Sequence, residues 1–278
     1  MFTETKYGAS PRDIPGYTNE RLREEFLLEN LFAEDRLQMV YTHVDRMIVA
    51  GALPVSQPLV IESGEALGTE SFFSAREAGI ANLGGPGLLV VDGETVEIAH
   101  RDIYYVGRGT GSVSMASVDP ANPAAFYINS VPAGEDLPGA LIRREESKPV
   151  EIGEAARANL RTLRMYIHPE VSPSCLLLMG ITETAPGSVW NTEPPHLHER
   201  RMEAYVYFNM APEDRVMHFM GEPSQVRTLV VADRQGVLSP AWSIHMGAGT
   251  GPYCFVWGMT GENKAYADFT PVPVKDLL

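Results

Sequence analysis

The sequence has only two cysteines in 278 residues, Cys175 and Cys254. Both lie in apolar, strand-like stretches, so we expect two buried thiols in a reducing compartment rather than a disulfide framework. No run of 18 apolar residues occurs, and the N-terminus shows no basic segment followed by an apolar one. We therefore expect neither a membrane span nor a secretory signal, and the expected location is the cytoplasm.

Clusters of basic residues are also missing. The 22 Lys and Arg residues are outnumbered by 36 Asp and Glu residues, which gives a formal net charge of −14. Because no basic run is present to neutralise phosphates, a nucleic-acid partner is not expected. The charge also argues against a DNA-linked regulator.

Turn-forming residues, in contrast, are frequent, with 25 Gly and 21 Pro. From residue 84 onward, short apolar or alternating runs are separated by turn residues, which is typical of antiparallel strands. The runs form two successive sets, joined by a polar and charged stretch at residues 138–160. The expected fold class is therefore mainly β, with two β-barrels or sandwiches in one chain and a few short helices.

Two segments favour helices. Apolar residues in 19–40 roughly keep a helical period, and Thr18 or Asn19 can cap the start of that segment. A second, short helix is expected to follow Ser71 and to end at Gly79.

One short stretch, PPHLHERRMEAY at residues 194–205, combines residue types that bind metals. In a strand, His196 and His198 point to the same face. Glu203 faces the same cavity if the chain turns between it and the histidines, and His245 stands on another strand-like segment 42 residues further on. Three imidazoles and one carboxylate suit a divalent ion, whereas a lone His-x-His is more often an incidental polar strand edge.

The spacing His-x-His, four residues, Glu and a distant His resembles the cupin metal site. NTEPPHLHERRMEAYVYFNM, SPAWSIHMGAGT, FVWGMTGEN and the ending VPVKDLL are further similar to the 5-keto-4-deoxyuronate isomerase family, as are VVDGETVEI and IYYVGRG. This resemblance implies two cupin-like barrels in one chain (a bicupin). Residues 1–150 would form a cupin-like half without metal ligands, and residues 151–278 the metal-binding half.

The same resemblance implies one Zn²⁺ per chain, held by His196, His198, Glu203 and His245, and a homohexameric assembly. The implied enzyme is an intramolecular oxidoreductase, a ketol-isomerase. It would convert 5-dehydro-4-deoxy-D-glucuronate to 3-deoxy-D-glycero-2,5-hexodiulosonate in pectin and uronate degradation. From the ligand types alone, iron, manganese or nickel could replace zinc. A metal cupin oxygenase, a non-catalytic sugar-acid-binding cupin and a purely structural metal are the alternatives.

A ketol-isomerase also needs a group that carries a proton between neighbouring carbons. Glu203 is the first candidate, because a carboxylate ligand can partly detach and serve as the base. Tyr253 and Lys264 are further candidates from the C-terminal segments. A packed aromatic and a solvated turn residue are the alternative readings of these two.

The sugar-acid substrate carries a carboxylate, which arginine pairs with in a fork geometry. The candidates are Arg161, Arg164, Arg200 and Arg201. Arg200 and Arg201 are the preferred pair because they lie inside the metal segment. The alternative is that they form ion pairs with the many Asp and Glu residues.

Overall fold

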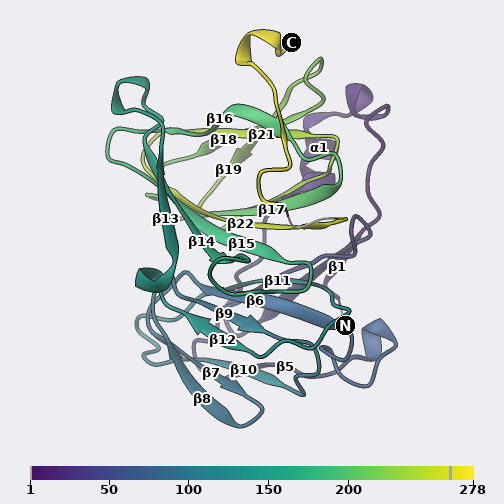
Figure 1. Cartoon of the computed structure of the whole chain (residues 1–278), viewed down its shortest axis with the longest axis vertical. Helices are drawn as coiled ribbons and strands as arrows, with labels where there is room; N and C mark the ends of the chain where they lie inside the picture. The colour runs from purple at the N-terminus through teal and green to yellow at the C-terminus, as the bar shows by residue number, and fades with distance from the viewer. Residues whose placement is uncertain (1, 263–264) are drawn as a thin grey trace. The chain divides into compact units, whose positions relative to one another are not determined.

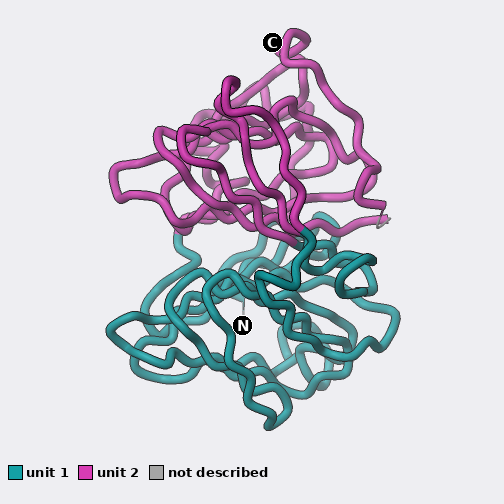
Figure 2. Tube along the Cα trace, turned by 60° about the vertical axis from the view of Figure 1, so that its left-hand side comes forward, with its two compact units in different colours: residues 1–6, 30–148, 165–179 teal, residues 7–29, 149–164, 180–278 magenta. Residues whose placement is uncertain are grey.

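The computed structural model describes residues 2–262 and 265–278, which form mostly β-strands (Figure 1). The one α-helix among the described residues is α1 (Asn19–Phe26). The described helices include none that is both long and apolar enough to cross a membrane. The chain forms two compact units (Figure 2): unit 1 comprises residues 1–6, 30–148 and 165–179, and unit 2 comprises residues 7–29, 149–164 and 180–278.

The strands of unit 1 form two sheets. The seven-stranded sheet has the order β1-β3-β4-β11-β6-β9-β12, and the four-stranded sheet has the order β5-β10-β7-β8. Apart from the parallel pair β1 and β3, the strand pairs that define these sheets are antiparallel. The bounds are β1 Glu4–Lys6, β3 Leu37–Thr42, β4 Ile48–Ala52, β5 Leu59–Ile61, β6 Arg76–Asn82, β7 Gly87–Val91, β8 Glu94–Ile98, β9 Ile103–Val106, β10 Val113–Ser117, β11 Phe126–Pro132 and β12 Ala140–Ile142.

The second pair of sheets carries the candidate site. Its seven-stranded sheet has the order β13-β14-β15-β22-β17-β20-β2, and its five-stranded sheet has the order β19-β18-β21-β16-β23. The bounds are β2 Leu27–Leu28, β13 Lys148–Ile152, β14 Arg161–Ile167, β15 Leu178–Thr184, β16 Trp190–Leu197, β17 Arg201–Phe208, β18 Val216–Gly221, β19 Arg227–Val231, β20 Gly236–Ser239, β21 Ile244–Gly249, β22 Cys254–Gly261 and β23 Thr270–Pro271. Short 3-10 turns lie at Ile14–Gly16, Glu65–Leu67, Arg144–Glu146, Ala155–Arg157 and Val274–Asp276.

Side-chain alternation places a different chemistry on each face of strand β6. Ala78 and Ile80 belong to the apolar core of unit 1, whereas Glu77, one position before Ala78, is buried on the other face. The Glu77 carboxylate accepts hydrogen bonds from the Tyr105 hydroxyl at 2.7 Å and from the backbone N–H of Leu177 at 2.7 Å. These bonds satisfy a charge that burial alone would make costly. The interior of this barrel is therefore a packed apolar core.

The helix expected over residues 19–40 is real only in its first third. Thr18 caps α1 by accepting a hydrogen bond from the backbone N–H of Arg21, and the helix ends at Phe26. Leu27 and Leu28 then pair with β20, and Leu37 starts a strand. The prediction was wrong beyond Phe26 because pairing with a distant strand overrides a local helical period.

The helix expected between Ser71 and Gly79 was also wrong. Residues 76–82 form β6, which pairs with β9 on one side and with β11 on the other. A strand buried on both faces has no simple alternation of polar and apolar residues, so its sequence looks like a short helix. The expected boundary between residues 150 and 151 stays a prediction.

Candidate metal centre

The turn between β16 and β17 brings the predicted ligands together. At this turn the backbone N–H of Arg201 donates to the carbonyl oxygen of His198 at 2.9 Å, and the chain reverses into β17. Glu203 therefore returns to the side of the histidines, as the spacing requires for a shared cavity. The fourth residue, His245, lies on β21 directly opposite His196 in the strand register.

The ligand atoms of these four residues converge on one point. Their nitrogen and oxygen atoms all lie within 4.8 Å of one another. His196 Nε2 lies 3.0 Å from His198 Nε2 and 3.1 Å from His245 Nε2. Glu203 Oε2 lies 3.1 Å from His198 Nε2 and 3.0 Å from His245 Nε2. Ligands bound to one ion at about 2.0–2.1 Å are about 3 Å apart, so the arrangement fits a single divalent ion.

Burial sets the protonation of this cluster in the direction that metal binding needs. Burial lowers the pKa of His196 to about 2, with the neighbouring His245 and His198 adding to the shift, and burial also lowers the pKa of His198. For Glu203, burial alone would raise the pKa, but the contacts with His245 and His198 outweigh it and hold the pKa well below its usual value. Neutral imidazoles and an ionised carboxylate present free lone pairs to a cation.

Neighbouring groups orient two of the imidazoles through the ring nitrogen that faces away from the cluster. His245 Nδ1 lies 3.2 Å from Ser239 Oγ, and His198 Nδ1 lies 3.4 Å from the carbonyl oxygen of Asp268. The guanidinium of Arg201 lies against the same His198 nitrogen, with Nη2 at 3.2 Å. Such contacts at the second nitrogen fix the direction of a ligating imidazole.

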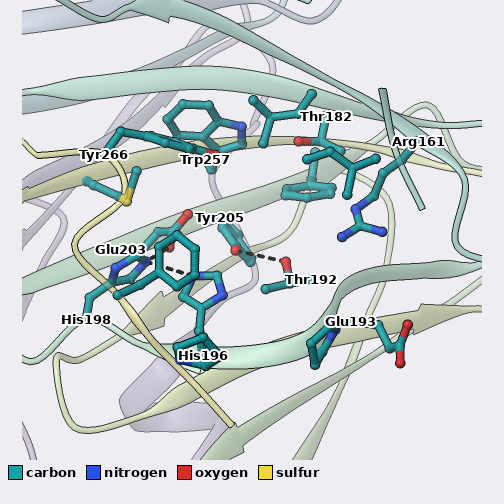
Figure 3. Close-up of a pocket in the computed structure, with 17 residues that line it drawn as sticks. Arg161, Thr182, Thr192, Glu193, His196, His198, Glu203, Tyr205, Trp257 and Tyr266 are labelled. Carbon is teal, nitrogen blue, oxygen red and sulfur yellow. Dashed lines mark hydrogen bonds and ion pairs between the residues drawn. The ribbon is translucent and has the colours of Figure 1, made fainter. Parts of the chain in front are cut away.

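A pocket of about 310 Å³ opens beside the cluster, and His196, His198 and Glu203 form part of its wall (Figure 3). This volume is at the small end of the range for small-molecule sites, roughly 300–1,000 Å³. Its other lining groups include aromatic side chains from β17, β22 and the segment beyond β22, namely Tyr205, Phe255, Trp257, Tyr266 and Phe269. An ion in the cluster would therefore be reachable by a small ligand.

The other predicted site residues lie in different settings. Arg200 is exposed and forms an ion pair with Asp268 at 2.7 Å. Tyr253 is buried, with its hydroxyl donating to the Val189 carbonyl oxygen at 2.9 Å, and it is not among the pocket-lining residues. Lys264 lies outside the described residues.

Two of the three other arginine candidates, Arg164 and Arg201, also have partners. Arg201 is almost fully buried, and its guanidinium donates to the carbonyl oxygens of Ala265, Tyr266 and Asp268 at 2.9, 3.0 and 3.1 Å. Arg164 lies 3.7 Å from Glu183. Substrate binding by Arg200 and Arg201 stays a prediction, and the contacts that Arg201 makes already occupy its donors.

The sequence reasoning missed the aromatic side of the pocket. Tyr205 stands two residues after Glu203 on β17, so strand alternation places both on one face, and that signal was available. Trp257 and Tyr266 had no such signal, because their place depends on how β22 pairs with β17 and on the chain that follows.

Two barrels in one chain, with a three-histidine, one-glutamate cluster beside a pocket of the second, define a bicupin with one candidate metal centre among the described residues. The chain belongs to the KduI/IolB family, whose model matches residues 26–273. The expected family and the expected two-cupin fold class are thus both confirmed.

The relatives agree with one another in name. The chain is 47% identical over 274 residues to the 4-deoxy-L-threo-5-hexosulose-uronate ketol-isomerase of Lachnoclostridium phytofermentans, covering 99% of each chain. It is 50% identical over 258 residues to the enzyme of the same name from Yersinia pseudotuberculosis, covering 92% of this chain and 93% of the relative.

Solved structures support the fold. An IolB-like protein from Salmonella typhimurium superposes with a TM-score of 0.67 at 14% identity, covering 92% of this chain and 91% of the other. Oxalate decarboxylase of Bacillus subtilis superposes with a TM-score of 0.56 at 10% identity, covering 81% of this chain and 71% of the other.

Proposed function

We propose that this protein is a zinc-dependent ketol-isomerase that converts 4-deoxy-L-threo-5-hexosulose-uronate to 3-deoxy-D-glycero-2,5-hexodiulosonate. The observation that carries the proposal is the convergence of three imidazoles and one buried carboxylate beside a pocket of about 310 Å³. Named relatives with 47% and 50% identity are ketol-isomerases of this uronate. They support the enzyme class expected from the sequence, an intramolecular oxidoreductase.

The reaction moves hydrogen between two neighbouring carbons. A proton leaves the hydroxyl-bearing carbon beside the aldehyde and a proton is added to the aldehyde carbon, while the hydroxyl proton passes to the former aldehyde oxygen. A divalent ion held by His196, His198, Glu203 and His245 would supply a positive charge that stabilises the negative oxygen developing on the substrate. The aromatic side chains around the pocket exclude water, which strengthens such interactions.

Glu203 is the proposed carrier of the proton. Its carboxylate is buried, ionised and in contact with His198 and His245 through Oε2. A base within reach of both carbons can remove the proton from one and return it to the other. Glu203 would thus serve both as a ligand and as the base.

The test is turnover of freshly prepared 4-deoxy-L-threo-5-hexosulose-uronate before chelation, after chelation and after zinc is added back. Activity that is lost and then restored by zinc would support the proposal. Undiminished turnover by demonstrably metal-free protein would refute the metal-dependent reaction. Oxygen consumption with substrate would instead identify a cupin oxygenase, and saturable binding without turnover would identify a binding protein.

Two further features of the proposal concern the protein as a whole. We propose a homohexamer on the strength of the family resemblance, and a cytoplasmic location. Light scattering of the purified chain measures the first, and a monomer would contradict it. Fractionation of the source cells measures the second.

A further inference from the structure

An arginine is buried in the pocket, and no carboxylate among the described residues forms an ion pair with it. Arg161, the first residue of β14, is 8% exposed and lines the same pocket as three of the candidate metal ligands. Burial lowers the pKa of Arg161, because it removes water from around the charged guanidinium. A buried charge of this kind is normally paired.

The described residues offer Arg161 one hydrogen bond and no ion pair. Nη1 donates to the carbonyl oxygen of Asn159 at 2.7 Å, and no described group accepts a hydrogen bond from Nε or Nη2. The carboxylate that lines the pocket nearby, Glu193, is already bound by Asn159 Nδ2 at 2.6 Å and by Arg157 Nη2 at 3.0 Å. The guanidinium therefore keeps a free donor edge.

Two more polar atoms of the pocket lining lack partners. Thr182 Oγ1 and Trp257 Nε1 are buried, and neither has a hydrogen-bond partner among the described residues. Buried polar atoms without partners are uncommon and call for an explanation such as a ligand. We refer to these two atoms and the Arg161 guanidinium together as the polar groups of the pocket, whose lining is otherwise largely aromatic and aliphatic.

Within the pocket, Arg161 and Thr182 lie apart from the candidate metal ligands. Figure 3 shows Arg161 and Thr182 on one side, with the guanidinium pointing into the pocket, and His198 and Glu203 on the other. In a hexosulose-uronate, the carboxylate and the aldehyde are at opposite ends of the carbon chain. A substrate in this pocket can thus meet both groups at once.

We propose that Arg161 binds the carboxylate of the sugar acid, and that Thr182 and Trp257 complete this subsite by hydrogen-bonding to its polar groups. This inference rests on the proposed function for the identity of the acid. Arg161 thereby sets the orientation of the bound substrate, because the aldehyde end of the sugar acid then faces His196, His198 and Glu203. Neutral sugars of the same size lack the group that the subsite recognises.

The first measurement compares Arg161→Gln with the wild-type protein in steady-state turnover of the uronate, with zinc bound. We expect KM to rise about 10- to 100-fold, because a hydrogen-bonded charge pair is lost, while the metal content stays at the wild-type level. Arg161→Lys keeps the positive charge but not the forked donor geometry, so its KM should lie between those of the wild type and Arg161→Gln. Arg108→Gln, which removes a surface ion pair with Asp136 in unit 1, is the matched control and should leave KM unchanged.

The second measurement does not depend on catalysis. Calorimetric titration of metal-free protein with D-galacturonate and with uncharged D-galactose tests recognition of the carboxylate alone. We expect the wild type to prefer galacturonate at least about tenfold and Arg161→Gln to lose that preference. If Arg161→Gln is poorly folded, the comparison is made with Arg161→Lys, for which a weakened preference is expected.

The outcomes separate this inference from the proposed function. No wild-type preference for galacturonate, or an equal preference in the variants, would overturn the carboxylate subsite even if the isomerase is active. A preference that depends on Arg161 in a protein without isomerase activity would leave the subsite standing and refute the proposed reaction instead.

Discussion

The two barrels of this chain have matching strand orders but different interiors. The run β3-β4-β11-β6-β9 of the first barrel corresponds to β14-β15-β22-β17-β20 of the second, and β5-β10-β7-β8 corresponds to β16-β21-β18-β19. In both, the corresponding strands follow one another in the same order along the sequence. A comparison position by position is therefore possible.

The register shows what stands at the ligand positions of the first barrel. His196 pairs with His245 across β16 and β21, and the corresponding pair across β5 and β10 is Ile61 with Val113. Ala78 begins the ladder from β6 to β9 as Glu203 begins the ladder from β17 to β20. The residues Ile61, Ala78 and Val113 all belong to the apolar core of unit 1.

An arginine stands at the same position in both barrels. Arg76 stands two positions before Ala78, as Arg201 stands two positions before Glu203. Arg76 donates to the carbonyl oxygens of Arg46 and Ser130 at 2.7 and 2.8 Å, just as Arg201 donates to three carbonyl oxygens. Arginine at this position thus anchors backbone segments whether or not ligands stand nearby. The same positions of this barrel fold can therefore carry either candidate metal ligands or apolar core residues.

The largest effect is expected from making the second barrel resemble the first. His245→Val copies Val113 and removes one imidazole from the cluster. We expect metal binding to fail and turnover to fall on the order of 1,000-fold, since a bound ion contributes several kcal/mol to such a reaction. Elemental analysis and initial rates measure the two losses, and circular dichroism should show an intact fold.

The reverse exchange, Val113→His, is the control for that prediction. It places a single imidazole beside Ile61 and Ala78, whose side chains cannot bind a metal, so the metal content should stay at the wild-type level. A variant His245→Val that keeps its metal and its rate would break the comparison. A Val113→His protein that binds more metal than the wild type would also contradict the comparison.

A smaller effect should separate the two arginines. Arg76→Met and Arg201→Met each remove hydrogen bonds from a buried guanidinium to carbonyl oxygens, so each should lower the free energy of unfolding by roughly 1.5–3 kcal/mol. Only Arg201→Met should also weaken zinc binding, by about 10- to 100-fold, because its guanidinium lies against His198. Urea denaturation of the metal-free proteins and competitive zinc titration measure these effects. Equal zinc affinity in both variants would show that Arg201 is an anchor and nothing more.

The smallest effect concerns pH. Burial lowers the pKa of His218 in the second barrel to about 3, with a further contribution from His245, and its Nδ1 lies 2.8 Å from the Tyr207 hydroxyl. The unfolded chain takes up a proton below its ordinary pKa of about 6.5, which the folded chain does not, so stability falls as the pH falls from that value toward 3.

For this one group, the loss between pH 7 and pH 5 should be about 1–2 kcal/mol. His218→Gln in the metal-free protein should show a correspondingly flatter dependence of its unfolding free energy on pH. The exposed His100 of unit 1 provides the control substitution, His100→Gln. An identical pH dependence in His218→Gln and in the wild type would mean that His218 binds protons equally in the folded and the unfolded protein.

The candidate metal cluster was predictable because residue type and local spacing identify each of its members in the sequence. His196 and His198 share a strand face, and Glu203 and His245 follow at offsets that a barrel can bring together. The role proposed for Arg161 was less visible, because it depends on which side chains bind the nearby Glu193 carboxylate, which is a property of the folded chain. The ends of α1 and the strand β6 were missed for a related reason, since their partners are strands far away in the sequence.

The contacts of Arg201 connect a candidate metal ligand with one wall of the pocket. One guanidinium holds the backbone at Ala265, Tyr266 and Asp268 and also lies against His198. Tyr266 and Phe269, from the same segment, line the pocket. An ion that fixes the orientation of His198 should therefore also favour one position of the segment that carries Tyr266 and Phe269. If the ion in this way changes the affinity for a sugar that contacts this segment, the sugar must change the affinity for the ion by the same factor.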